Sequence, residues 1–404
     1  MKPFKNKQTE YKECFHKICV VGGGLTGAIM ILLLKNSGLF EKDEIAWIKP
    51  REKKLSDLRT TLYNSKSIDL LKNSGLLKSL KQDDYTNVRQ ISVFGARGSL
   101  PLIWDSSDLT DPLGIIIKNE VVLNAINEKL NDIIHYDGVI TNTTINNFER
   151  TLYLNNKKNI KTHLLLSADG KNSYIRKLLS INTINKNTKH IAISGFLKQS
   201  RKHNGTALQA FTELGPIGIL PFENDNIINF VQSIEKNKLQ NLLYKNNLEE
   251  FVCKNLNEFF LESDLSFKPI KNINGIKNKL STWDLDLNLV INPTAERTIL
   301  IGDAAHSIHP LAGQGLNLAF RDCVSVIKAI QKSSEFGNDL GDQAIIDFYK
   351  KDRLPQTLSM TAFTDFLFYG FTSRSAKTKK ILNKGMESLN RSNLKNIFKV
   401  FASI

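Results

Sequence analysis

Cysteines and long apolar stretches are scarce in this 404-residue sequence. Its four cysteines are Cys14, Cys19, Cys253 and Cys323, and they show no metal-ligand spacing. We therefore expect reduced thiols without a redox role. The seven histidines form no metal pattern either, and we predict no metal site. No run reaches about 18 uninterrupted apolar residues, which argues against a transmembrane helix. The first 17 residues lack the apolar centre of a secretory signal, so we expect a cytoplasmic protein.

Acidic residues are fewer than basic ones: the sequence has 40 Asp and Glu and 55 Lys and Arg, which gives a formal net charge of +15. This excess does not indicate nucleic-acid binding, because the lysines are spread over the whole chain and no nucleic-acid motif accompanies them. The C-terminal region alternates basic and apolar side chains. That pattern fits either a helix on an anionic membrane surface or one that covers another part of the protein. Its basic residues are Lys377, Lys379, Lys380, Lys384, Arg391, Lys395 and Lys399.

The chain is long for a single hydrophobic core, so we expect two lobes. A buried strand at His16–Gly22 is followed by a glycine-rich turn, an apolar helix at Ala28–Lys35 and a strand at Glu44–Ile48. This unit opens a doubly wound parallel sheet. Further helices are predicted at Ser65–Asn73, Glu120–Leu130 (capped by Asn119), Gln240–Phe260, Gly315–Lys332 and Asp342–Tyr369 (with a break or kink at Pro355), and further strands at Val88–Ala96, Leu113–Ile117, His163–Ser167 and Thr298–Ile301.

Between about Lys189 and Ile234 the pattern changes to four strands parted by turn residues, which is typical of an antiparallel sheet. The predicted fold class is α/β: a doubly wound, Rossmann-like dinucleotide-binding lobe with an inserted antiparallel-sheet lobe and C-terminal helices. We assign residues 1–85, 110–180 and 284–404 to the first lobe. Residues 86–109 and 181–283 form the second.

The glycine turn reads Gly22-Gly-Gly24-Leu-Thr-Gly27. Gly22 permits a tight turn, Gly24 lets a pyrophosphate approach the backbone, and Gly27 allows the helix to pack closely on the strand. The acidic residue that normally follows about 20 residues later, on the ribose, is missing. Lys49 stands near that place and would suit a 2′-phosphate, whereas Glu52 could reach in from the next turn.

A second informative segment begins with the strand at Thr298–Ile301 and breaks at Gly302–Asp303. It then passes through a bend rich in Pro and Gly into a helix near Gly315. A carboxylate at the end of a strand can hold sugar hydroxyls. Glycines that open a helix let backbone amides and the positive helix end approach an electron-rich ligand.

Three ordered motifs resemble those of the FAD-dependent aromatic hydroxylases (the para-hydroxybenzoate hydroxylase-like superfamily), and within them the ubiquinone-biosynthesis hydroxylases. The first is the glycine turn. The second, Asp169-Gly170-Lys171-Asn172-Ser173-Tyr174-Ile175-Arg176, matches DGxxSxxR at every defining position. The third comprises His309, Pro310, Ala312, Gly313, Gln314, Gly315, Asn317 and Asp322. Ala319 stands where relatives usually have Gly. The resemblance spans roughly residues 17 to 370.

Other segments match in part. Arg59 resembles an arginine near the flavin, although Leu62-Tyr63 departs from the family pattern. Asn119 falls where the family has Asn before a flavin-side helix, but Glu120 replaces the frequent Arg. Phe211–Pro221 resembles a strand pair above the flavin ring and is also, structurally, a hairpin.

The resemblance implies bound FAD, with Asp303 on the ribityl chain and the amides from Gly313 to Asn317 at the pyrimidine edge of the ring. It also implies that Asp169 shapes access for flavin and nicotinamide, held in place by Arg176. The complete predicted cofactor set is Gly22, Gly24, Gly27, Arg59, Asn119, Asp169, Arg176, Gly302, Asp303, Pro310, Gly313, Gln314, Gly315 and Asn317. We name no catalytic residue, because the cofactor performs the difficult steps, and we expect a geometric role for His309.

The activity implied is ring hydroxylation of a polyprenylated phenol in ubiquinone biosynthesis. NADH or NADPH would act as transient reductant, O₂ as co-substrate and a C4a-hydroperoxyflavin as oxidant. A lipid-like tail fits contact with the inner face of a membrane or with other proteins of the pathway. The segment Phe363–Phe371 fits either a lining for such a tail or a core helix. Two alternatives stay open: a flavin hydroxylase of a small aromatic substrate, and a non-catalytic FAD-bound scaffold.

Overall fold

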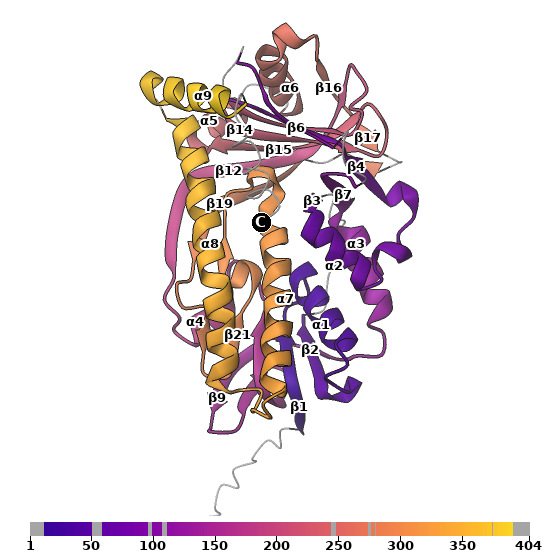
Figure 1. Cartoon of the computed structure of the whole chain (residues 1–404), viewed down its shortest axis with the longest axis vertical. Helices are drawn as coiled ribbons and strands as arrows, with labels where there is room; N and C mark the ends of the chain where they lie inside the picture. The colour runs from indigo at the N-terminus through magenta and orange to yellow at the C-terminus, as the bar shows by residue number, and fades with distance from the viewer. Residues whose placement is uncertain are drawn as a thin grey trace, which may run out of the picture.

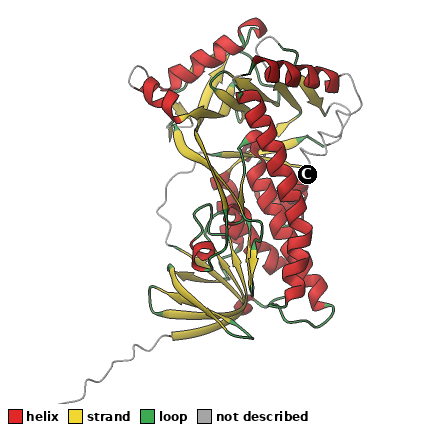
Figure 2. Ribbon diagram, turned by 90° about the vertical axis from the view of Figure 1, so that its left-hand side faces the viewer, coloured by secondary structure: helices red, strands yellow, loops and turns green. Residues whose placement is uncertain are grey.

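The chain forms two large sheets at opposite ends of the molecule, with long helices beside them (Figure 1, Figure 2). This computed structural model describes residues 12–50, 59–95, 99–106, 111–243, 248–273, 276–278, 280–373 and 375–390. Within those residues, no helix combines the length and apolar character that crossing a membrane requires.

The first sheet has eight strands, and its centre runs β21-β11-β1-β2-β8 with all neighbours parallel. These strands are β1 (Lys12–Val21), β2 (Ile45–Lys49), β8 (Ile134–Asp137), β11 (Lys158–Ser167) and β21 (Thr298–Leu300). The antiparallel additions are β9 (Ile140–Ile145), β10 (Arg150–Leu154) and β20 (Thr294–Ala295). The strands β2 and β21 and the C-terminal halves of β1 and β11 are buried on both faces, which is why they read as nearly continuous apolar runs, whereas β8 at the edge is mostly exposed.

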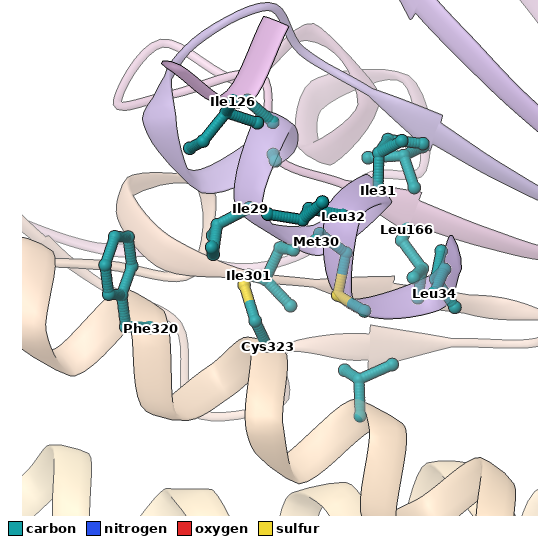
Figure 3. Packing of buried hydrophobic residues seen from close by; sticks show 14 of the residues in the cluster. Ile29, Met30, Ile31, Leu32, Leu34, Ile126, Leu166, Ile301, Phe320 and Cys323 are labelled. Carbon is teal, nitrogen blue, oxygen red and sulfur yellow. The ribbon is translucent and has the colours of Figure 1, made fainter. Parts of the chain in front are cut away.

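Helices cover one face of this sheet: α1 (Leu25–Asn36), α2 (Ser65–Asn73), α3 (Asn119–Lys129), α7 (Gln314–Ser334) and α8 (Gln343–Thr372). In Figure 3, Ile29 and Met30 of α1 pack between the strands and Cys323 of α7. The other face packs against β9, β10 and α4 (Tyr174–Leu178). The helices α7 and α8 run side by side along the long axis (Figure 1).

The second sheet has nine strands in the order β22-β19-β12-β15-β14-β13-β5-β6, with β16 beside β12. They are β5 (Gln90–Phe94), β6 (Leu102–Asp105), β12 (Ile184–Gln199), β13 (Thr206–Thr212), β14 (Gly215–Phe222), β15 (Ile227–Glu235), β16 (Phe267–Pro269), β19 (Ser281–Leu289) and β22 (His306–Ser307). In the part of the chain that the structure describes, β13–β5 is the one parallel pair of this sheet. Its outer face is covered by α6 (Leu248–Phe259), and α5 (Lys236–Leu243) follows β15.

Smaller elements join the lobes. The strands β3 (Thr60–Asn64), β7 (Gly114–Lys118) and β4 (Tyr85–Val88) form a three-stranded sheet. β17 (Asn272–Ile273) pairs with β18 (Ile276–Lys277), and α9 (Ala376–Asn390) packs near β6 and α8.

The predicted fold class is confirmed, with local corrections. The expected strand at Val88–Ala96 is two strands, β4 and β5. The expected helix at Gln240–Phe260 corresponds to α5 and α6, and residues 244–247 between them lie outside the described residues. Of the break or kink expected at Pro355, the break is absent, since α8 continues through it. Asn119 is the first residue of α3, not its cap, and Lys118 takes the cap position. The lobe boundaries remain a proposal; β19 belongs to the second sheet as far as Leu289, past the boundary drawn at residue 283.

Candidate functional site

The turn between β1 and α1 is held by contacts that only glycine permits. Gly22 has φ +126°, and a Cβ there would collide with the carbonyl oxygen of Ala168. A Cβ at Gly27 would collide with the carbonyl oxygen of Gly22. Gly24 differs, because a Cβ there would meet nothing within 4 Å. Gly22 and Gly27 thus serve the fold, while Gly24 leaves the backbone open to a ligand.

Among the described residues directly after β2, no Asp or Glu is present that could bind a ribose hydroxyl. Lys49 places its ammonium 3.9 Å from the centre of the Trp47 ring, a cation–π contact within its own strand. Glu52 lies outside the described residues. Lys49 therefore has a structural partner, and it does not line the cavity described below.

Asp322 on α7 organises the loop that follows β21. Its Oδ2 accepts hydrogen bonds from the Gly302 amide (2.8 Å) and His306 Nε2 (2.7 Å), and its Oδ1 accepts one from Arg353 Nε (2.8 Å). Burial raises the pKa of this carboxyl, but His306 and Arg353 outweigh it and hold the pKa below its ordinary value. The carboxylate fixes the 3-10 turn Gly302–Ala304, which sets Asp303 beside the cavity.

The N-terminal end of α7 follows a second tight turn, Leu311–Gly313, in which Gly313 is left-handed at φ +64°. Asn317 ties this turn to β3: its Nδ2 donates to the carbonyls of Leu62 (2.8 Å) and Gly313 (3.1 Å), and its Oδ1 accepts from the Asn64 amide. The Asn317 side chain is thereby fully engaged in holding the helix end. A Cβ at Gly315 would meet nothing within 4 Å, so the backbone there is open.

The DG segment is held differently from expectation. Asp169 Oδ1 accepts from Ser167 Oγ, and Oδ2 accepts from the amides of Tyr174 and Ile175, so this carboxylate caps α4. Arg176 donates to the carbonyls of Lys171 and Ala304, both at 2.7 Å, and attracts Asp169 only electrostatically. Arg176 therefore clamps the DG segment to the loop that carries Asp303.

Arg59 and Asn119 come together where β3 meets β7. The Asn119 amide donates to the carbonyl of Arg59 (2.9 Å), and Asn119 Oδ1 accepts from Thr61 Oγ1 (2.7 Å). Both residues line the same cavity. Arg59 and Asn119, whose motifs match the family only in part, therefore lie together at the cavity.

A cavity of about 1130 Å³ lies where these segments converge. Seven of the predicted residues line it: Gly24, Arg59, Asn119, Asp303, Pro310, Gly313 and Gly315. The other seven are not among its lining residues: Gly22, Gly27, Asp169, Arg176, Gly302, Gln314 and Asn317. Neither His306 nor His309 lines it.

The second sheet supplies the opposite side of the cavity, which we call the sheet wall. It consists of Ile91, Ser194, Ala207, Leu208, Gln209, Gly218, Leu220, Val231, Trp283, Asp284, Leu285, Asp286, Leu287 and Ser307. None of these described residues is Arg or Lys, and the cations that line the cavity, Arg59 and Lys171, come from the first lobe. Lys198 and Arg201, the cations available from sequence, are exposed elsewhere, and Arg201 pairs with Asp264.

Sequence reasoning missed one contributor, the face of α3 formed by Glu120, Leu123, Asn124 and Asn127. Their spacing of three and four residues places them on one side of a helix. That spacing was visible in the sequence. The signal was weak, because polar residues on a helix ordinarily face solvent.

Two titratable groups near the cavity have shifted pKa values. Asp303 is accessible from the cavity but surrounded by protein; desolvation raises its pKa, while His306, Arg59 and Lys171 act against this. His309 is fully buried and stacks on Phe368, with 3.8 Å between ring centres. Burial, with Lys186 and His190, lowers its pKa to about 3, so the ring is neutral and serves packing.

The segment Phe363–Phe371 belongs to α8 and does not line the cavity. Phe368 and Phe371 are buried, and Phe371 stacks on Phe211 with 4.0 Å between ring centres. Of the two interpretations left open, the core helix fits these contacts.

The residues present fit FAD. The cavity exceeds the range of about 300–1,000 Å³ typical of ligand pockets, so it has room for a large cofactor and a second molecule. Open backbone at Gly24 and Gly315, each at the start of a helix, suits an anionic pyrophosphate and an electron-rich ring edge. In the described residues no group of three or more His, Cys, Asp and Glu could hold a metal ion.

Comparison with known proteins agrees with this arrangement. The profile of a family described as FAD binding domain matches residues 16–364. Ubiquinone biosynthesis monooxygenase COQ6, mitochondrial, of Dictyostelium discoideum is 26% identical, with 96% of this chain and 90% of that protein aligned. The protein of the same name from Homo sapiens is 25% identical over 96% of this chain and 92% of its own length.

A solved structure shows the same fold. The p-nitrophenol 4-monooxygenase PnpA from Pseudomonas putida DLL-E4 superposes with a TM-score of 0.74 at 15% identity, covering 96% of this chain and 97% of that one. At this identity the likeness concerns the fold alone.

Proposed function

Because the chain belongs to the family of the FAD binding domain, and is a flavin-dependent monooxygenase, we propose that it hydroxylates the aromatic ring of a polyprenylated phenol in ubiquinone biosynthesis. The mitochondrial relatives carry that pathway in their names, and the alignments cover nearly the whole of both chains.

The observation that carries the choice of substrate is the composition of the sheet wall. Its described residues are mostly apolar, with Asp284 and Asp286 as its charged members. An aromatic acid would need a cation to balance its carboxylate in a partly buried site. Lys171, which lines the cavity beside this wall, is already engaged by Asp286 (3.8 Å) and by the carbonyl of Asp284 (3.0 Å). A neutral phenol with an apolar tail meets no such requirement, which favours it over the small aromatic acid.

The protein's own residues would hold and orient the reactants. The open backbone at Gly24 receives the pyrophosphate, Asp303 accepts hydrogen bonds from ribityl hydroxyls, and the N-terminal end of α7 faces the pyrimidine edge of the ring. When bound, FAD supplies the redox chemistry, by the route that the sequence resemblance implies. The balance is Ar–H + O₂ + NAD(P)H + H⁺ → Ar–OH + NAD(P)⁺ + H₂O. The nicotinamide nucleotide would bind transiently beside the DG segment.

We also propose that the protein works in the cytoplasm at the inner face of a membrane, where its substrate resides, in contact with other proteins of the pathway. Lys377, Ile381 and Lys384 on α9 are exposed, which supports an interfacial role for the basic C-terminal segment. Arg391, Lys395 and Lys399 lie outside the described residues.

The test measures aerobic NADH and NADPH oxidation by the FAD-loaded protein, with and without a prenylated phenol, together with product mass. We expect the phenol to accelerate oxidation and to gain one oxygen atom. Bound FAD with no stimulated turnover on any phenol would instead indicate the scaffold. Turnover confined to small aromatic acids would indicate the other hydroxylase.

A further inference from the structure

Four neighbouring strands of the second sheet place one residue each in a single row across the sheet wall. Ser194 on β12 pairs with Val231 on β15, Val231 with Gly218 on β14, and Gly218 with Gln209 on β13. All four line the cavity. Residues in register across adjacent strands point to the same face, so this row is one continuous strip of wall.

Gln209 is the polar end of the row, and its amide has a fixed orientation. Nε2 donates to the carbonyl of Ile217 at 3.0 Å. A carbonyl can only accept, so the amide nitrogen must be on that side and Oε1 on the other. Oε1 has no hydrogen-bond partner among the described residues and is not sealed from solvent, although Gln209 is only 9% exposed. The strip thus presents one immobilised acceptor to the cavity.

Gly218 makes room for this arrangement. A Cβ there would lie 3.6 Å from Gln209 Oε1, an ordinary contact distance, so the amide lies over the glycine. Ser194 stands at the other end of the row, three strand spacings or about 14 Å from Gln209 between Cα atoms. Between them lie Val231 and the bare backbone of Gly218, an apolar strip that suits an aromatic ring.

We propose that this strip is the ring-binding subsite and that Gln209 Oε1 accepts a hydrogen bond from the phenolic hydroxyl of the substrate. The assignment rests on the proposed function, because it requires a phenol as ligand. A fixed, mostly desolvated acceptor selects a group that can donate, since an analogue without the O–H leaves the acceptor unpaired. Gln209 is then a substrate-positioning and specificity-determining residue.

The experiment compares two probes that differ only in the donor: para-hexylphenol and its methyl ether, para-hexylanisole. Each is titrated into FAD-loaded protein, and binding is followed by the change in flavin absorbance. Native protein should prefer the phenol by about tenfold, the value of roughly one net hydrogen bond. In Gln209→Leu this preference should fall to near one, with the affinity for the ether within about twofold of native and FAD retained.

Gln90→Leu is the matched control, because Gln90 lies in the same sheet on β5 and does not line the cavity. It should keep the native preference. Gly218→Ala is the second variant, compatible with the fold because the new methyl meets only an ordinary contact. It should shield Oε1, weaken binding of the phenol and lower the preference.

The outcomes separate the two proposals. Equal discrimination between phenol and ether in native protein and in both variants overturns the role of Gln209 and leaves the proposed function standing. A native protein that retains FAD but binds neither probe overturns the phenol as substrate, and this subsite with it.

Discussion

Asp303, which we propose as a cofactor contact, has a cost for the fold. Although its side chain is exposed to the cavity, protein atoms surround it, and this desolvation is the main reason that its pKa lies above the ordinary value of 3.8. An acid whose folded-state pKa is raised favours folding below its unfolded pKa, and that contribution is lost as the pH rises through the folded pKa. At neutral pH, ionised Asp303 is therefore a cost to the protein without cofactor.

We expect Asp303→Asn to raise the melting temperature of the flavin-free protein at pH 7 and to change it little near pH 4. The same change should weaken FAD binding by tenfold or more, because a charged hydrogen-bond acceptor is worth about 1.5–3 kcal/mol. Thermal unfolding at both pH values and flavin titration measure the two effects. Asp347→Asn, an exposed change on α8, is the control. Retention of full flavin affinity would contradict the assigned contact.

At the scale of elements, the turn between β1 and α1 separates the needs of the fold from those of the ligand. We expect Gly22→Ala to destabilise the protein by at least about 3 kcal/mol, because it combines a strained φ with a backbone collision. Gly24→Ala should leave the flavin-free protein within about 0.5 kcal/mol of native, as an unobstructed substitution does. It should nevertheless bind FAD about tenfold more weakly, since the methyl keeps the pyrophosphate from the backbone.

Denaturant unfolding and flavin titration of this matched pair give both quantities. If Gly24→Ala binds FAD as native protein does, the pyrophosphate does not approach the backbone at this glycine.

Elements with strong local signals were predictable from sequence. The close approach at Gly27 involves the nearby Gly22 carbonyl and so follows from short-range geometry, whereas the collision at Gly22 is with the distant Ala168; α2 has the bounds expected from its pattern. Pro355 does not break α8, because packing overrides this local effect. It lies on the exposed side of α8, where water can satisfy the carbonyl that its missing N–H leaves free, while packing on α7 maintains the helix.

Features that depend on register between distant strands could not be predicted. Ser194 and Gln209 are 15 positions apart, and their common face follows only from the pairings of β12, β15, β14 and β13. A slip of one residue in any pairing would turn one of them away from the cavity. Arg176 likewise looked like a partner for Asp169, and only the three-dimensional approach of Ala304 shows what it clamps.

At the scale of the whole molecule, the two sheets are coupled by contacts from several segments. Thr60 Oγ1 donates to Asn229 Oδ1 (3.0 Å), and Lys118 pairs with Glu223 (2.5 Å), each joining the three-stranded sheet to the second sheet. The helix α8 runs beside α7 and also contacts β14 (Figure 1). Because the chain passes between the lobes repeatedly, neither sheet can lose its packing alone, and we expect one cooperative transition.

The three tryptophans make this testable, since Trp47 lies in the first sheet while Trp104 and Trp283 lie in the second. Each variant retains one tryptophan, with the other two changed to Phe. Its fluorescence midpoint in denaturant is compared with its own far-UV circular dichroism midpoint, which removes any change in overall stability caused by the substitutions. The two midpoints should coincide in every variant, whichever lobe holds the tryptophan. Excess FAD at about 100 times its Kd should stabilise both signals equally, by about 2.7 kcal/mol. A shift confined to the Trp47 signal would show that the lobes unfold independently and that FAD engages only the first.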